Sequence, residues 1–273
     1  MPSGPITFAV IGRNDGSLLP AALRDVTSAA RPGDRVLYVD GSSSDGSAEI
    51  ARSHGVEVIA APVGKGRSME IALRSARTPY LLFFDADLER SEHNIAERLR
   101  DALQVEQPAM LVGEITQPGR RVVVIRRLHS AFMRALFPEA RRPPGPAPMS
   151  GFRIISTDVD TGRLPPGYGI ETHLNIRLVM DGERVTSTPV GEYIGPTRGY
   201  VTAAPMGVEI AQTILDSAES YGRLSPSMRP RWEAWSVPII QLAMEAARDP
   251  SPWEELNERA RELAWRPLPA TAP

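Results

Sequence analysis

Short apolar runs alternate with amphipathic segments through the first part of the chain. The predicted strands are rich in β-branched and aromatic residues and cover residues 6–11, 36–39, 56–59 and 80–84. The segments between them have the spacing of helices and cover residues 18–30, 47–54 and 67–76. Strands that alternate with helices are typical of βαβ units. The pattern therefore predicts a mostly parallel sheet with helices on both faces.

The second half of the chain is less regular. Helices are predicted at 91–103 and 122–137, with a strand at 110–113 between them. Residues 141–148 (RRPPGPAP) form neither, because proline fixes φ and lacks a backbone donor. We interpret this stretch as a mobile loop beside the site, with a domain linker as the alternative. The later elements are a strand at 151–155, a helix at 171–180, a strand at 185–189 and two or three amphipathic helices from residue 206.

Composition limits the class of protein. Of the 273 residues, 42% are hydrophobic and 23% are charged, which is an ordinary globular balance. The formal net charge of −2 gives no electrostatic reason to expect nucleic acid as a partner. The absence of cysteine excludes disulfides, thiolate metal sites and a cysteine nucleophile, and it fits a cytoplasmic protein. We expect no signal peptide and no transmembrane segment, because the apolar runs are too short.

Three polar clusters directly follow predicted strands. They are Arg13-Asn14-Asp15, Asp40-Gly41-Ser42-Ser43 and Asp85-Ala86-Asp87. Open α/β sheets bind ligands at the carboxyl ends of their strands, and parallel strands place those ends at one edge. The three clusters therefore predict a single site.

Asp85 and Asp87 are the strongest candidates for chemistry. Two carboxylates that flank one small residue at the end of a strand can reach a single hard cation. Such an ion would bridge the two phosphates of a nucleotide donor and neutralise the departing diphosphate. The alternative is a helix cap, in which Asp87 accepts hydrogen bonds from the turn before Ser91. The position directly after an apolar strand favours the metal.

The cluster that begins at Asp40 has two interpretations. Asp40 and Ser42 can hydrogen-bond to a base or a ribose, and Gly41 lets a ligand approach the backbone closely. The alternative is a tight loop in which Ser44 or Asp45 caps the next helix. We expect both, with Asp40 and Ser42 as ligand contacts and Asp45 as the cap.

The segment Gly64-Lys65-Gly66-Arg67 begins a predicted helix. Backbone amides at a helix N-terminus, together with Lys65 and Arg67, favour an anion. The segment is not a P-loop, because the full glycine spacing and the following Ser or Thr are absent. Taken alone, it is typical of a surface turn.

In this order and spacing, the motifs resemble the nucleotide-binding half of family 2 glycosyltransferases with the GT-A fold. In that family an early strand ends in an Asn-Glu-like pair, here Asn14-Asp15, and the second strand ends in a variant of Val-Asp-Asp-Gly-Ser-x-Asp, here residues 39–45. A Gly-Lys-Gly and an Asp-x-Asp follow, as at 64–66 and 85–87. The resemblance implies an α/β GT-A (Rossmann-like) fold, to which the pattern above adds a helical C-terminal region.

Two later segments are similar to the glucosyl-3-phosphoglycerate synthases. Residues 148–152 (PMSGF) are similar to their Leu-x-Gly-Glu-like loop, and 164–171 (LPPGYGIE) to their Gly-Tyr-Gly-Val-Glu segment. By this resemblance Ser150 and Gly151 lie near the donor sugar, while Tyr168 and Glu171 face the acceptor. The alternative for Glu171 is a carboxylate favoured by the dipole of the helix that it begins.

The chain departs from those synthases in two places. They carry a histidine after a later strand that completes the metal site, whereas the corresponding stretch 190–195 has none. His173 is the candidate third ligand, although a histidine on a helix is more often packed or half-exposed. They also carry a Gly-Arg-Val-Thr acceptor loop, which residues 119–122 (GRRV) match only in part, since the threonine is missing. Arg120 and Arg121 are therefore candidates to hold an anionic acceptor by bidentate contacts.

The resemblance implies a metal-dependent glycosyltransferase that uses Mg²⁺ or Mn²⁺. It would move a sugar from a UDP- or GDP-sugar to a small, soluble, anionic acceptor such as a phosphoglycerate-like molecule. Asp87 and Glu171 are the candidate catalytic residues, and we expect retention of configuration. The candidate metal ligands are Asp85, Asp87 and His173. The candidate contacts of the nucleotide-sugar are Arg13, Asn14, Asp15, Asp40, Ser42, Lys65, Asp85, Ser150 and Gly151.

The organisation expected from the resemblance has three parts. Residues 1–115 form the nucleotide-sugar-binding half, 116–205 the acceptor-binding half of the same domain, and 206–273 the C-terminal helices and tail. A homodimer is expected by analogy alone. Two other functions stay open. One is a nucleotidyltransferase, and the other is a degenerate nucleotide-sugar-binding protein, which the missing histidine suggests.

Overall fold

The structure is a computed structural model of the 273-residue chain, and it describes residues 4–116, 123–141, 144–195, 203–248 and 253–272. The chain forms two compact units. The first comprises Met1–Pro118 and Arg142–Pro196, and the second comprises Gly119–Arg141 and Thr197–Pro273.

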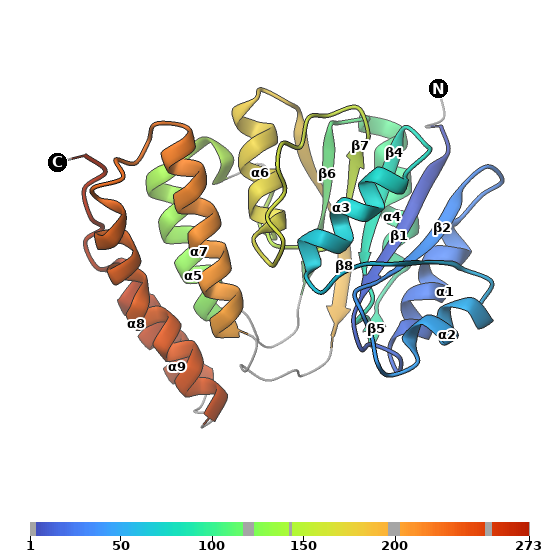
Figure 1. Ribbon diagram of the computed structural model, residues 1–273, viewed down its shortest axis with the longest axis horizontal. Coiled ribbons are helices and arrows are strands. Elements are labelled where there is room, and N and C mark those ends of the chain that lie inside the picture. The colour runs from blue at the N-terminus through green and yellow to red at the C-terminus, as the bar shows by residue number, and fades with distance from the viewer. Residues whose placement is uncertain (1–3, 117–122, 142–143, 196–202, 249–252, 273) are drawn as a thin grey trace. The chain divides into compact units, whose positions relative to one another are not determined.

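In the described part of the first unit, an eight-stranded sheet has the order β3-β2-β1-β4-β7-β6-β8-β5 (Figure 1). The strands β1 to β4 are parallel, and so are β6 and β8. By contrast, β7 runs antiparallel to both neighbours and β5 runs antiparallel to β8. The bounds are β1 (Ile6–Gly12), β2 (Arg35–Asp40), β3 (Glu57–Ala60), β4 (Tyr80–Asp85), β5 (Arg90–Ser91), β6 (Met110–Thr116), β7 (Arg153–Ser156) and β8 (Val185–Ile194).

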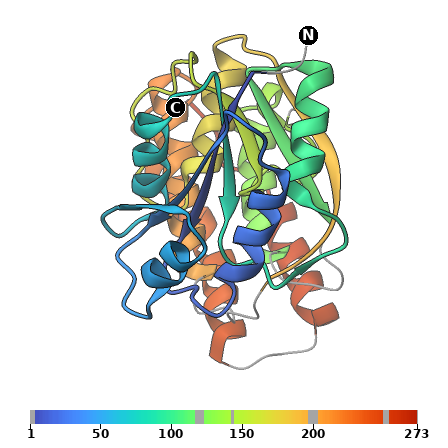
Figure 2. The ribbon, with the colours of Figure 1, turned by 90° about the vertical axis from the view of Figure 1, so that its right-hand side faces the viewer.

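Helices cover both faces of this sheet, because alternate strand residues point to opposite sides. Phe8 belongs to the core formed with α1 and α4, whereas Ala9 belongs to the core formed with α3 and α6. Figure 2 shows α3 and α4 on opposite sides of the strands. The predicted α/β architecture with a mostly parallel sheet is confirmed. The helices of this unit are α1 (Leu19–Ala29), α2 (Ser47–Ser53), α3 (Lys65–Ser75), α4 (Ile95–Glu106) and α6 (Ile170–Met180).

The second unit is helical. Its core includes Phe132 of α5, which meets Trp232 of α8 edge to face with 5.1 Å between ring centroids. Gly207 lets α7 approach α5 closely, since a β-carbon there would lie 2.6 Å from Cδ1 of Ile125. The helices are α5 (Val123–Leu136), α7 (Ala203–Ser220), α8 (Arg229–Arg248) and α9 (Trp253–Trp265), with a 3₁₀ turn at Glu139–Arg141.

The two units divide the chain differently from the three predicted segments. The helix α5 falls within the predicted segment 116–205, but it packs with the C-terminal helices. Its residues Leu128 and Phe132 are fully buried. A hydrophobic face predicts that a helix is buried but not which elements cover it, so the sequence pattern left this assignment open.

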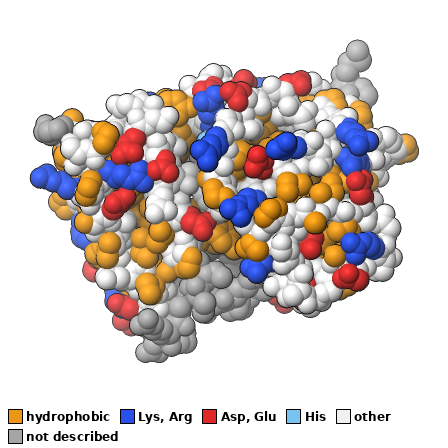
Figure 3. Space-filling view, viewed as in Figure 1, with side chains coloured by type: hydrophobic (Ala, Val, Ile, Leu, Met, Phe, Trp, Pro, Cys, Tyr) orange, Lys and Arg blue, Asp and Glu red, His pale blue; other side chains and the backbone are white. Residues whose placement is uncertain are grey.

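On the side of the molecule drawn in Figure 3, acidic and basic side chains are interspersed and form no large patch of one charge. None of the helices in the described residues has both the length and the apolar character needed to cross a membrane.

His129 makes the stability of the helical unit depend on pH. This residue of α5 is 5% exposed, and burial, with a smaller effect of Arg126, lowers its pKa to about 4. Among the described residues, its Nε2 atom has no hydrogen-bond partner. The unfolded chain takes up a proton at the ordinary histidine pKa of about 6.5, so acid favours unfolding as the pH falls through that value.

We predict that His129→Gln reduces the acid sensitivity of this unit. Between pH 7 and pH 5 the wild-type unit should lose about 2 kcal/mol more unfolding free energy than the variant. Guanidinium unfolding followed by tryptophan fluorescence measures this, because all four tryptophans lie in the second unit. Asp25, whose pKa burial raises to about 6, acts in the opposite direction but equally in both proteins. Equal pH dependence in the two proteins would contradict the prediction.

Candidate functional site

The strand register brings the three predicted polar clusters to one edge of the sheet. Gly12 of β1 pairs with Asp40 of β2, and Ile11 pairs with Asp85 of β4. The loops that follow are tied to these strands, since Gly41 donates its amide to Gly12 O at 2.9 Å and Ala86 donates to Ile11 O at 2.9 Å. The prediction that the three clusters meet at the carboxyl ends of parallel strands is therefore confirmed.

Asn14 joins the first two of these loops. Its amide donates to Oγ of Ser43 at 3.0 Å, and its side-chain Oδ1 accepts the amide of Ser44 at 2.8 Å. Asn14 also has a φ of 57°, which is uncommon for a residue other than glycine. Its side chain and amide therefore hold the neighbouring loop.

Asp15 and Asp40 are buried, with 5% and 9% exposure. Oδ2 of Asp15 accepts the amide of Arg13 at 2.9 Å, and Oδ1 of Asp40 accepts the amide of Ser43 at 3.2 Å. Ser42 has a φ of 66° and donates its hydroxyl to Ala61 O at 2.8 Å. Left-handed backbone at residues other than glycine costs free energy and concentrates at binding sites. These residues fix the conformation of the two loops where the sequence predicts nucleoside contacts.

A buried ion cluster lies beside these loops. The ammonium of Lys65, at the start of α3, lies 2.8 Å from Oδ1 of Asp85 and 2.6 Å from Oε1 of Glu171 in the first turn of α6. The side chains of Lys65, Asp85 and Glu171 are 19%, 25% and 5% exposed. Burial by itself would lower the pKa of Lys65, but the two carboxylates outweigh it and raise that pKa above its ordinary value.

Two glycines place Lys65 in this cluster. A β-carbon at Gly64 would lie 2.4 Å from Pro166 O, and one at Gly66 would lie 1.9 Å from Pro165 O. The amide of Arg67 donates to Pro166 O at 3.1 Å. The Gly-Lys-Gly segment therefore packs directly on the loop before α6. This contact accounts for both glycines, and it uses one of the amides that were predicted to face an anion.

Gly151 lies against the carboxylate of Asp85. A β-carbon at Gly151 would be 2.0 Å from Oδ2 of Asp85, so any side chain there would displace that carboxylate. The structure thus brings Gly151 together with Asp85. The hydroxyl of Ser150 instead accepts the amide of Phe152 at 3.3 Å, and Ser150 is only 3% exposed.

Arg153 holds the loop that contains Ser150 and Gly151. It is fully buried, and its Nε donates to Ser150 O at 3.0 Å while Nη1 donates to Oδ1 of Asn175 at 3.1 Å. Asn175 in turn donates Nδ2 to Pro148 O at 2.7 Å. Sequence reasoning missed this arginine. The signal was a charged residue at the start of the otherwise apolar strand β7.

Tyr193 holds the second aspartate and was also missed. Its hydroxyl donates to Oδ1 of Asp87 at 2.8 Å, and its ring packs on Phe152 with 5.2 Å between centroids. Burial, and then the charge of Asp85, raise the pKa of Asp87. Tyr193 belongs to the stretch 190–195, in which the family resemblance led us to look for a histidine.

The structure does not bring His173 to the two aspartates. Residues two apart on a helix point about 200° apart, so His173 faces away from Glu171. Its Nε2 lies 2.8 Å from Thr161 O. Among the described residues, no group of three His, Asp or Glu side chains is arranged to hold a metal ion. A metal at this edge would therefore depend on Asp85 and Asp87.

The predicted acceptor residues are only partly described. Tyr168 lies in the loop before α6 and is 37% exposed. Arg120 and Arg121 lie outside the described residues.

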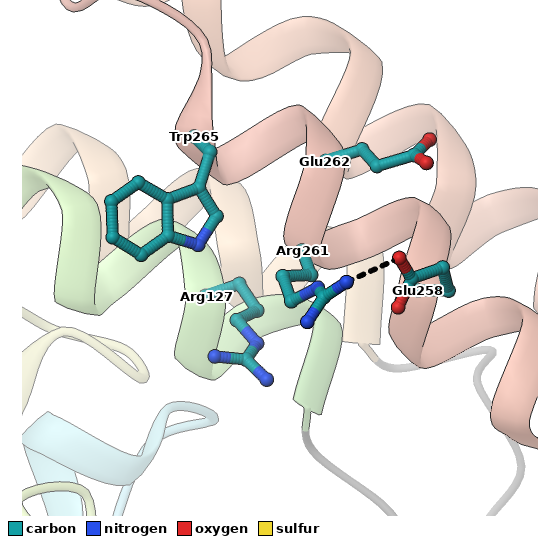
Figure 4. Close-up of a pocket in the computed structure, with 5 residues that line it drawn as sticks. All are labelled: Arg127, Glu258, Arg261, Glu262 and Trp265. Carbon is teal, nitrogen blue, oxygen red and sulfur yellow. Dashed lines mark hydrogen bonds and ion pairs between the residues drawn. The ribbon is translucent and has the colours of Figure 1, made fainter.

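A hollow of about 600 Å³ lies in the helical unit, between α5 and α9 (Figure 4). None of the predicted site residues lines it. Arg261 pairs with Glu258 at 2.5 Å, and Arg127 donates to Oδ1 of Asn257 at 3.3 Å. We assign no ligand to it. Its lining residues are Arg127, Glu258, Arg261, Glu262 and Trp265.

Comparison with known proteins shows a family model and several glycosyltransferases that are similar to this chain. The model of glycosyl transferase family 2 matches residues 7–161. Glycosyltransferase AglJ of Haloferax volcanii is 24% identical over an alignment of 182 positions that covers 59% of this chain and 54% of that relative. The uncharacterized glycosyltransferase Mb0553 of Mycobacterium bovis is 33% identical over 88 residues, which are 32% of this chain and 38% of that relative. The chain thus spans about half the length of the first relative and less of the second.

Two solved structures are similar over most of the chain. Glucosyl-3-phosphoglycerate synthase from Mycobacterium tuberculosis, in complex with phosphoglyceric acid, has a TM-score of 0.70 and 19% identity over 79% of this chain and 80% of that one. Mannosyl-3-phosphoglycerate synthase from Rubrobacter xylanophilus has a TM-score of 0.71 and 22% identity over 81% of this chain and 76% of that one. At these identities the likeness is one of fold, and it confirms the expected GT-A fold.

Because the family model covers more than half of the residues, including every strand-end motif at this edge of the sheet, the chain belongs to glycosyl transferase family 2.

Proposed function

We propose that the chain is a metal-dependent glycosyltransferase that uses a UDP- or GDP-sugar and a small anionic acceptor. The observation that carries the proposal is the pair Asp85 and Asp87 at the end of β4, with the ammonium of Lys65 2.8 Å from Asp85. This edge of the sheet has carboxylates that could bind a metal ion and an ammonium that could bind a phosphate. A similar fold supports the substrate classes, because the mycobacterial glucosyl-3-phosphoglycerate synthase has been solved with Mn²⁺, UDP-glucose and phosphoglyceric acid.

The residues at this edge fit a divalent ion of the Mg²⁺ or Mn²⁺ class. Such ions prefer carboxylate oxygens, which Asp85 and Asp87 supply. The missing side chain at Gly151 leaves room for the carboxylate of Asp85, and Tyr193 orients that of Asp87. When bound, the ion would neutralise the charge that develops on the leaving nucleoside diphosphate.

The protein's own residues would divide the remaining tasks. Lys65 would balance phosphate charge, and the loops with Arg13-Asn14-Asp15 and Asp40 to Ser42 would enclose the nucleoside. The loop with Ser150 and Gly151 would face the donor sugar. On the acceptor side we propose Tyr168 and Glu171, together with Arg120 and Arg121 for an anionic group.

We propose retention of configuration. Inversion requires a base within hydrogen-bond reach of the acceptor hydroxyl. Glu171 is the candidate carboxylate on that side, but its Oε1 is engaged by Lys65 at 2.6 Å and its side chain is 5% exposed. This arrangement suits a positioning role for Glu171 better than proton abstraction.

Nucleotide binding should stabilise the protein only when metal is present. At a ligand concentration of 100 times its Kd, the stabilisation is about 2.7 kcal/mol, which raises the unfolding midpoint by a few degrees. Thermal unfolding with UDP, GDP and their glucose and mannose forms, each with Mn²⁺, Mg²⁺ or EDTA, measures this shift. Asp87→Ala should abolish it.

The matched control is Asp101→Ala, which removes an aspartate of α4 whose side chain is 63% exposed and lies 3.6 Å from Arg31. It should keep the full shift. A shift of equal size in EDTA would contradict metal dependence, and no shift with any nucleotide would overturn the donor assignment. Incorporation of a nucleotide into product would instead favour the nucleotidyltransferase.

Gly151→Ala should preserve the fold but abolish the metal-dependent shift. The added methyl group meets the carboxylate of Asp85, which can rotate away without moving the backbone. The variant should therefore stay folded without ligand, with a midpoint lowered by the disturbed contact between Asp85 and Lys65. Gly4→Ala is the control, because its β-carbon makes an ordinary contact 3.6 Å from Pro79. A normal ligand shift in Gly151→Ala would show that the position of Asp85 is unimportant.

The product of transfer from UDP-glucose should keep the α configuration of the donor. Incubation with Mn²⁺ and 3-phosphoglycerate, followed by ¹H NMR of the anomeric proton, distinguishes the two outcomes by their coupling constants. A β-linked product would overturn retention and return Glu171 to the role of general base. Hydrolysis of the donor without transfer would reject phosphoglycerate as acceptor.

A further inference from the structure

Lys65 and a divalent ion need the same carboxylate. The ammonium lies 2.8 Å from Oδ1 of Asp85, which is the hydrogen-bonding distance of a direct ion pair. A metal ion coordinated by Asp85 would place two positive charges on one carboxylate. At such short separations inside a protein, like charges repel strongly.

The backbone of Lys65 cannot withdraw to relieve this repulsion. Gly64 and Gly66 on either side are packed against the carbonyl oxygens of Pro166 and Pro165. Only the flexible side chain can move, and it has a second anchor in Glu171, whose Oε1 lies 2.6 Å away. The ammonium can therefore leave Asp85 while it stays in the site.

We propose that Lys65 is a counter-ion that competes with the divalent ion for Asp85, so that metal and nucleoside diphosphate bind as a coupled pair. This inference rests on the proposed function. The metal alone must displace the ammonium, which lowers its affinity. When the diphosphate arrives with the metal, its negative charge gives the ammonium a new partner, and Glu171 keeps that ammonium in reach. Each ligand thereby raises the affinity of the other.

In a variant without the ammonium, the affinity for the metal alone and the affinity for the nucleotide should change in opposite directions. Lys65→Met should bind Mn²⁺ alone about tenfold more tightly than the wild type, because the competitor is gone. The same variant should bind UDP or GDP in saturating Mn²⁺ about tenfold more weakly, because a phosphate contact is lost. The factor by which nucleotide raises Mn²⁺ affinity should therefore fall.

The experiment titrates Mn²⁺, detected by electron paramagnetic resonance of the free ion, into the full-length protein without nucleotide and with UDP or GDP. Lys65→Arg keeps the charge and should retain weak binding of Mn²⁺ alone. Arg74→Met is the matched control, since it removes a cation from the same helix at a side chain that is 79% exposed. It should behave as the wild type. Lys65→Gln repeats the test in a polar side chain, so that the result does not depend on whether Lys65→Met folds.

The outcomes separate this inference from the proposed function. If the wild type binds neither nucleotide with Mn²⁺, the proposed function fails and the inference with it. If the wild type binds the pair but Lys65→Met and Lys65→Gln bind Mn²⁺ alone no more tightly than Arg74→Met, the competition is overturned and the proposed function stands. Tighter binding of Mn²⁺ alone with weaker binding of nucleotide supports the coupled pair.

Discussion

The ion cluster of Lys65, Asp85 and Glu171 is the interaction on which the rest of the site depends. Removing an ammonium and two carboxylates from water costs several kcal/mol for each ion, and this cost is offset only by close and well-oriented contacts. The cluster meets that condition, with separations of 2.8 and 2.6 Å. Its members come from the start of α3, the end of β4 and the first turn of α6. These three elements must therefore meet at one point.

Small residues and backbone carbonyls make that meeting possible. Gly64 and Gly66 let α3 touch the loop before α6, and Gly151 lets a third segment reach Asp85. Arg153 then fixes this third segment through carbonyl oxygens, with its guanidinium fully buried. A charge surrounded by carbonyl dipoles and near the carboxylates of the cluster stays solvated by the protein itself. The site is thus rigid where carboxylates must be aimed, which favourable metal or phosphate contacts require.

The sequence predicted the parts of the fold and site that depend on local pattern. The strands and helices follow from the spacing of apolar residues along the chain. The meeting of the three clusters follows from the parallel topology, because consecutive βαβ units place the carboxyl ends of their strands at the same edge of the sheet. The assignments that failed or were missed depend on contacts between residues far apart in the chain. Tyr193 reaches Asp87 across 106 positions. Likewise α5 packs with helices that begin after residue 203, and no local period contains that information.

Tyr193 lies near the end of β8, in the stretch where the resemblance led us to look for a histidine ligand. Its hydroxyl is a donor toward Asp87, so it orients the carboxylate and withdraws charge from it, whereas a histidine would contribute a ligand of its own. Fewer protein ligands and a weaker carboxylate both lower the affinity for a free ion. In the proposed function a metal would be needed chiefly while the diphosphate is bound, and phosphate oxygens are among the ligands that such ions prefer. The proposed ion site would therefore be incomplete without the nucleotide, and this would tie the cation to the leaving group that requires it.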